Sequence, residues 1–204
     1  MIIKLRTSLF PPSCQSGVFA ILLVLLQATT PAVAASESFQ RIESETLAGQ
    51  PFVFPDDLRA AKLNIVMLAI SEEQENGSWQ GDALLEWYAA LEKAGLLSND
   101  VMAWHLSVLK VPFFVKGLVR GGMAKSYKGK VPLDQAAALF VKDVGKFAES
   151  AGIELDGQPT IILVSPAGEM LYRFKGVVSD AQIDGVREAV GALGIQPGES
   201  NAAG

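Results

Sequence analysis

The chain has 204 residues, half of them hydrophobic, with 17 basic and 22 acidic side chains and a net charge of −5. This length suits one globular domain with appendages, and the acidic balance weighs against nucleic-acid binding. Cys14 is the only cysteine, which excludes disulfide and metal-thiolate chemistry from the rest of the chain.

The first 34 residues have the pattern of a secretory signal peptide. Lys4 and Arg6 precede an apolar run over 17–28, and Ala32-Val33-Ala34 resembles a cleavage site. The run is shorter than the roughly 20 residues that a membrane span needs, although an uncleaved anchor remains an alternative. We therefore expect an exported, periplasmic protein without cysteine, in which 15 basic and 22 acidic residues give a net charge of −7.

The remaining sequence divides into three parts. Residues 35–46 are a polar amino-terminal extension, 47–196 carry the alternating apolar runs of one domain, and 197–204 form a small polar tail that we expect to be disordered. No internal repeat is present.

Three apolar runs in the first half of the domain predict strands. They cover 52–54, 63–70 and 101–109, and the second is almost continuously apolar, as in a strand buried on both faces. After a polar loop, a helix is expected from about Ser78 to Ala94, because apolar residues recur along it at helical spacing.

The middle of the domain is less regular. Residues 113–123 are apolar but contain three glycines, so they predict at best a weak helix. The following segment fits a strand over 137–142 and a helix over 144–151, or a single helix over 134–151. We favour strand plus helix.

The carboxyl-terminal third has the clearest pattern. Pro159 precedes a buried strand over 160–164, a Pro-Gly turn and a second strand over 170–174. Ser179-Asp180-Ala181-Gln182 is a capping box that opens an amphipathic helix.

This order of elements, from about Leu47 to Leu193, resembles the thioredoxin-like fold. The resemblance implies an α/β domain with a central mixed β-sheet and helices on both faces. It also implies that Pro159 is a cis-proline facing the active site, while the alternative is an ordinary trans-proline at a strand start.

The same resemblance places the active-site groove between Ser71–Trp79 and Pro159. Redox cysteines of thioredoxin-like enzymes lie there, but this sequence has none, so thiol oxidoreductase and peroxidase activity are excluded by residue type. The groove residues are Ser71, Glu72, Glu75, Trp79 and Pro159, and a carboxylate-based reaction is the alternative function.

Cofactor and metal sites find little support in the sequence. His105 is the only histidine, and we interpret it as a structural residue of its strand. One histidine without cysteine cannot assemble a zinc, copper or haem site. The acidic residues at 72–75 and 82 are more typical of a helix start than of a calcium site. We expect no cofactor.

The basic residues are unevenly distributed. Residues 101–133 contain six of the fifteen basic side chains expected after cleavage and no acidic one, with aromatic and aliphatic residues between them. Such a segment suits an anionic membrane surface or an acidic protein partner, while the alternative is a solvated covering of the sheet. The candidate binding residues are Phe113, Phe114, Lys116, Arg120 and Lys125.

This segment also loosely resembles the mitochondrial ATP-synthase assembly factors of thioredoxin-like fold, and exported bacterial proteins of this fold without thiols. No functional residue is carried over from either. The sequence therefore predicts a non-catalytic binding or assembly-assisting module of the cell envelope.

Overall fold

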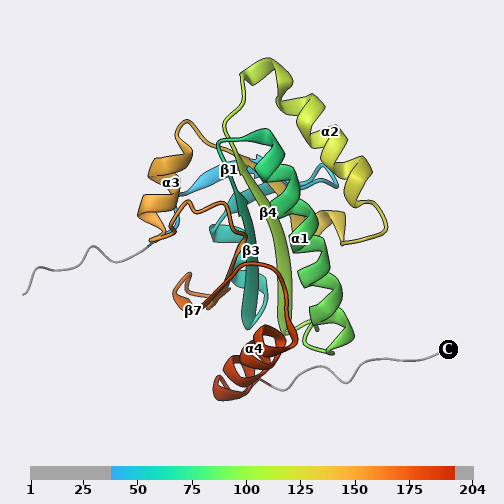
Figure 1. Cartoon of the computed structure of the whole chain (residues 1–204), viewed down its shortest axis with the longest axis vertical. Coiled ribbons are helices and arrows are strands. Elements are labelled where there is room, and N and C mark those ends of the chain that lie inside the picture. Colours follow the sequence, from blue (N-terminus) through green and yellow to red (C-terminus); the bar gives the residue numbers. More distant parts are fainter. Residues whose placement is uncertain (1–37, 196–204) are drawn as a thin grey trace, which may run out of the picture. The chain divides into compact units, whose positions relative to one another are not determined.

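The computed structural model describes residues 38–195 (Figure 1). Its centre is a five-stranded mixed sheet in the order β5-β4-β3-β6-β7. The strands are β3 (Leu63–Ile70), β4 (Val101–Leu109), β5 (Ala136–Phe140), β6 (Thr160–Val164) and β7 (Met170–Lys175). β3, β4 and β5 are parallel, whereas β6 is antiparallel to β3 and β7 to β6.

β3 is the middle strand because its sequence suits burial on both faces. All eight of its residues are buried, and it pairs with β4 on one side and β6 on the other. A hairpin of β1 (Ile42–Glu45) and β2 (Pro51–Phe54) lies against β5, where Leu47 N–H donates to the Ala136 carbonyl at 2.7 Å.

Helices cover both faces of the sheet, as expected. The helices α1 (Gln74–Lys93), α2 (Lys116–Tyr127) and α4 (Asp180–Ala192) pack against one apolar cluster. The helix α3 (Val144–Ser150) and β2 pack against the other. Short 3₁₀ helices connect these elements: η1 (Asp56–Ala60), η2 (Phe113–Val115) and η3 (Leu133–Gln135).

Three segments differ from the sequence-based expectation. Residues 42–45, expected in a polar extension, form β1. α1 begins at Gln74, so Trp79 lies inside the helix and not in a loop. Residues 116–127 form a full helix in spite of three glycines, because the inner side chains of α2 pack on the sheet and supply the stability that the glycines lack.

The expectation of a cis-proline at Pro159 is wrong. In residues 38–195 the one cis peptide bond joins Phe54 and Pro55. The carbonyl of Pro159 accepts a hydrogen bond from Gly176 N–H at 2.9 Å, so Pro159 simply extends β6. At a strand start the missing N–H of proline costs no ladder bond, and the trans form fits there.

Residues 38–195 all belong to one compact unit. Every strand and helix named above, and both apolar clusters, belong to this unit. It therefore holds a complete hydrophobic core. The expected signal peptide (1–34) and disordered tail (197–204) lie outside the described residues.

Candidate functional site

A small cleft, here called the α1 cleft, lies beside the residues for which the thioredoxin-like pattern predicts an active-site groove. It lies at the carboxyl end of β3, has a volume of about 290 Å³, and is lined by Ile70, Ser71, Glu72, Glu73, Asn76, Leu155 and Gly157. Of the predicted groove residues, Ser71 and Glu72 line it. Glu75, Trp79 and Pro159 do not: Glu75 and Trp79 are exposed on α1, and Pro159 is buried beside the sheet.

The carboxylates at the start of α1 do not converge on this cleft. The side chains of Glu72, Glu73 and Glu75 are all exposed. The Ser71 hydroxyl accepts from the N–H of Glu73 at 3.0 Å and donates to its carbonyl at 2.9 Å. A serine engaged in a local turn and carboxylates in solvent do not form an acid–base pair.

An amide network that the sequence does not reveal closes the inner wall of the α1 cleft. Gln80 is fully buried, accepts from Ile70 N–H at 2.9 Å and donates to the Ile70 carbonyl at 2.9 Å. It also donates to Asn76 Oδ1 at 2.7 Å, and Asn76 Nδ2 donates to the Gly157 carbonyl at 3.0 Å. These bonds join β3, α1 and the loop before β6.

His105 is structural, as interpreted from the sequence. It is 1% exposed, and its ring lies against that of Tyr127 with centroids 4.5 Å apart. Neither ring nitrogen has a hydrogen-bond partner. Burial lowers the pKa of His105 to about 3, so the imidazole is neutral at physiological pH.

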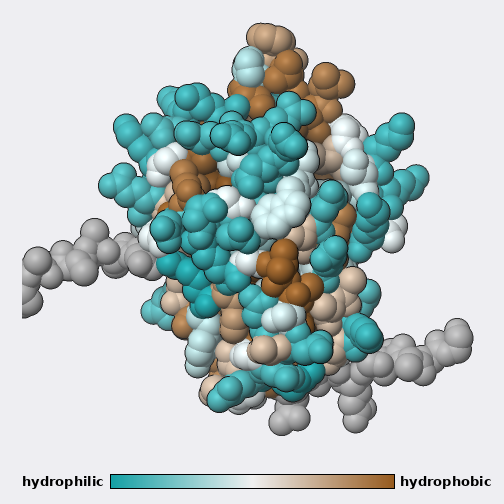
Figure 2. Space-filling model, viewed as in Figure 1, coloured by the Kyte–Doolittle hydropathy of each residue, from teal (hydrophilic) through white to brown (hydrophobic). Residues whose placement is uncertain are grey.

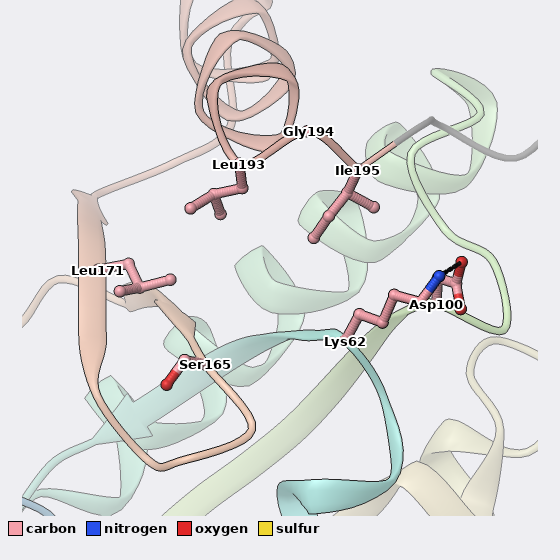
Figure 3. A pocket seen from close by; sticks show the side chains of 7 residues that line it. All are labelled: Lys62, Asp100, Ser165, Leu171, Leu193, Gly194 and Ile195. Carbon is pink, nitrogen blue, oxygen red and sulfur yellow. Dashed lines mark hydrogen bonds and ion pairs between the residues drawn. The ribbon is translucent and has the colours of Figure 1, made fainter.

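A second cleft, which the sequence did not predict, lies at the opposite end of the parallel strands (Figure 3). It has a volume of about 420 Å³ and apolar walls of Leu171, Leu193 and Ile195. Lys62 and Asp100 stand at its side, joined by an ion pair of 2.8 Å. Because the two charges satisfy one another, the cleft presents no free ionic group to a ligand.

Among residues 38–195, the most exposed large apolar side chains lie on η2 and the first turn of α2. Phe113, Phe114 and Leu118, here called the α2 tip, are 87%, 84% and 78% exposed. Figure 2 shows apolar residues gathered over this part of the molecule. Isolated exposed apolar residues are ordinary, but a contiguous patch indicates an interaction site.

The predicted basic residues divide into two groups. Lys116 lies over the Phe140 ring at 5.2 Å, and Arg120 pairs with Glu45 and lies 5.9 Å from the same ring. These two attach α2 to β5 and β1. Lys125 is exposed, as are Lys110, Lys128 and Lys130. Of the five candidate binding residues, Phe113, Phe114 and Lys125 therefore face solvent. Leu118, which lies one helical turn after Phe114, joins them.

Residues 38–195 contain neither a metal-binding cluster nor a membrane-spanning helix. No group of three or more His, Cys, Asp and Glu side chains is arranged to hold a metal ion. Within the same range, the helices are too short or too polar to cross a membrane.

Comparisons with known proteins place this geometry among solved structures. No protein-family model matches the chain, and no curated protein is significantly similar to it. Yeast Sco1 is 16% identical with a TM-score of 0.53, over 78% of this chain and 97% of that one. Copper-bound ScoI of Arabidopsis thaliana is 15% identical with a TM-score of 0.52, over 78% of this chain and 99% of that one.

This chain has a thioredoxin-like fold. At these identities the likeness concerns the fold alone. The expected fold class is confirmed, because the mixed sheet with helices on both faces and the two structural neighbours agree.

Proposed function

We propose that this protein is an exported, non-catalytic binding module of the cell envelope, and that its binding surface is the α2 tip. The exposure of Phe113, Phe114 and Leu118 supports this proposal most strongly. Export is supported by the signal-peptide pattern of residues 1–34.

Redox and copper chemistry fit the chain poorly. Residues 38–195 contain no cysteine and a single histidine, His105, which is buried beneath Tyr127. Copper needs several thiolate, thioether or imidazole ligands at one place. Residues 38–195 offer no thiolate and one buried imidazole, so copper binding, as in the Arabidopsis neighbour, finds no support from these two ligand types here.

The energetics favour a reversible contact. Burying a large apolar side chain contributes about 1.5–3 kcal/mol, so the three residues of the α2 tip supply roughly 5–9 kcal/mol before the cost of association. That cost is several kcal/mol, which leaves a weak to moderate affinity. A weak to moderate affinity suits a module that binds its partner reversibly.

Affinity capture from a cell-envelope extract tests the proposal. Residues 35–204 are compared with the double variant Phe113→Ser/Phe114→Ser and with a matched control, Tyr172→Ser/Val177→Ser, whose side chains are 41% and 52% exposed elsewhere. We expect the α2-tip variant alone to lose its bound material, whether lipid or protein. Equal capture by all three proteins, or no capture by any, would contradict the proposal.

A further inference from the structure

The surroundings of the α2 tip indicate what covers it. Residues 101–133 include no Asp or Glu. Lys110, Lys125, Lys128 and Lys130 are exposed there, and no acidic side chain of the described residues pairs with them. Lys110 precedes the apolar tip by three residues, and Lys125 lies two turns after Leu118 on the same face of α2, whereas Lys128 and Lys130 follow the other end of the helix. The tip and the helix behind it thus carry positive charge without acidic partners.

This charge pattern argues against a second copy of the chain as the occupant. A symmetric contact places the same patch of both copies face to face, which would bring identical lysines together. Like charges at an interface are repulsive, and no acidic residue of α2 is present to offset them. The complementary surface is anionic.

The size of the patch argues against a stable protein partner. An aromatic side chain buries about 150–250 Å², so two phenylalanines and a leucine fall short of the roughly 800 Å² per partner that a stable interface needs. A bilayer has no such threshold, because each inserted side chain contributes separately and lysines bind headgroup phosphates.

The exposed acidic residues indicate which face an anionic surface would avoid. Glu72, Glu73 and Glu75 are exposed at the start of α1. This helix start lies at the same end of the sheet as the α2 tip but belongs to a different element. An anionic surface would repel these carboxylates. The outer face of α2, which carries Leu118 and Lys125 two turns apart, is the face free of carboxylates.

We propose that the α2 tip docks on an anionic lipid bilayer, with Phe113 and Phe114 in the boundary between headgroups and acyl chains and the lysines on lipid phosphates. This inference rests on the proposed binding function and adds the chemistry of the partner. The contact is peripheral and reversible, and it weakens as salt screens the lysines.

Co-sedimentation with vesicles tests the proposal. Residues 35–204 are mixed with phosphatidylcholine vesicles, or with equal parts of phosphatidylcholine and phosphatidylglycerol, at low and high NaCl. We expect binding to the anionic vesicles only. Phe113→Ser/Phe114→Ser should weaken it at least tenfold, since both side chains lose their apolar burial.

A charge variant separates the electrostatic part. Each lysine near an anionic surface contributes about fivefold in binding, so Lys110→Gln/Lys125→Gln/Lys128→Gln should weaken it about a hundredfold and reduce its salt dependence. The matched control is Lys93→Gln/Lys142→Gln/Lys146→Gln, in which three exposed lysines outside residues 101–133 are changed. Circular dichroism and melting temperature confirm that each variant is folded.

The outcomes distinguish this inference from the proposed function. Equal binding to both vesicle types, or equal loss in the controls, overturns the membrane inference. If no vesicle is bound but the α2-tip variant still loses capture from envelope extract, the partner is an acidic protein, and the proposed function stands without the membrane. If both assays are negative, both proposals fail.

Discussion

The buried imidazole of His105 makes the stability of this protein depend on pH in a calculable way. Its pKa is about 3 in the folded protein, because burial opposes the charged form, and about 6.5 in the unfolded chain. Between these values the unfolded state binds the extra proton. The stability contributed by neutral His105 is therefore complete above pH 6.5 and is lost as the pH falls towards 3.

The magnitude follows from the two pKa values. From pH 7.5 to pH 4.5 the free energy of unfolding should fall by about 2.7 kcal/mol through His105 alone, close to 1.4 kcal/mol for each pH unit below 6.5. At pH 4.5 the folded protein binds almost no proton at His105, because the pKa there is about 3. The fall in the free energy of unfolding down to pH 4.5 therefore depends almost only on the pKa in the unfolded chain. Carboxylates add their own pH dependence to this change.

The variant His105→Leu isolates the effect. Leucine has a similar size and no proton to gain, while the carboxylates titrate equally in both proteins. Urea unfolding of residues 35–204 at pH 7.5, 6.0 and 4.5 gives the free energy of unfolding of each. We expect the difference between wild type and variant to change by about 2.7 kcal/mol across this range. If the free energies of unfolding of both proteins change in parallel with pH, the claim that His105 is buried and neutral is refuted.

Further changes test other parts of the account. Gly121→Ala on the open face of α2, where an added Cβ meets nothing within 4 Å, should raise the free energy of unfolding by about 0.8–1 kcal/mol in urea unfolding; destabilisation would show that this face is packed. Phe113→Ser/Phe114→Ser should change the free energy of unfolding by less than about 0.5 kcal/mol, since both rings face solvent. A larger loss of stability in thermal unfolding would place the two rings in the core. Gln80→Leu should cost about 1–3 kcal/mol for each Ile70 backbone group left unpaired; unchanged stability would disprove the amide network. Thr160→Val should stabilise the fold by about 1 kcal/mol, because the buried Thr160 hydroxyl has no partner, and a destabilised variant would imply a missed hydrogen bond.

Much of the fold could be predicted from local pattern. β3, β4 and β6 lie where their apolar runs do, since such runs are stable only inside a sheet. Ser179 caps α4 as its sequence indicates, accepting from Gln182 N–H at 3.4 Å.

What could not be predicted depends on contacts between distant segments. The added first turn of α1 contains Asn76, whose side chain donates to the Gly157 carbonyl, and no helix-start signal encodes this distant contact. Pro159 was assigned by family resemblance, yet its isomer is set by the strand that follows it. In the candidate site, the uneven distribution of charged residues along the sequence identified the basic segment 101–133. Only the packing on Phe140 shows that Lys116 and Arg120 face inward.

The most direct test of the binding surface uses the absence of cysteine after residue 14. Leu118→Cys in residues 35–204 can be labelled with an environment-sensitive fluorophore, and Glu188→Cys, exposed on α4, gives a matched control. On addition of envelope membranes, the account predicts a blue-shifted, quencher-protected emission from position 118 and none from position 188. An unchanged spectrum at 118, or the same shift at both positions, would contradict the claim that the α2 tip is where this protein binds.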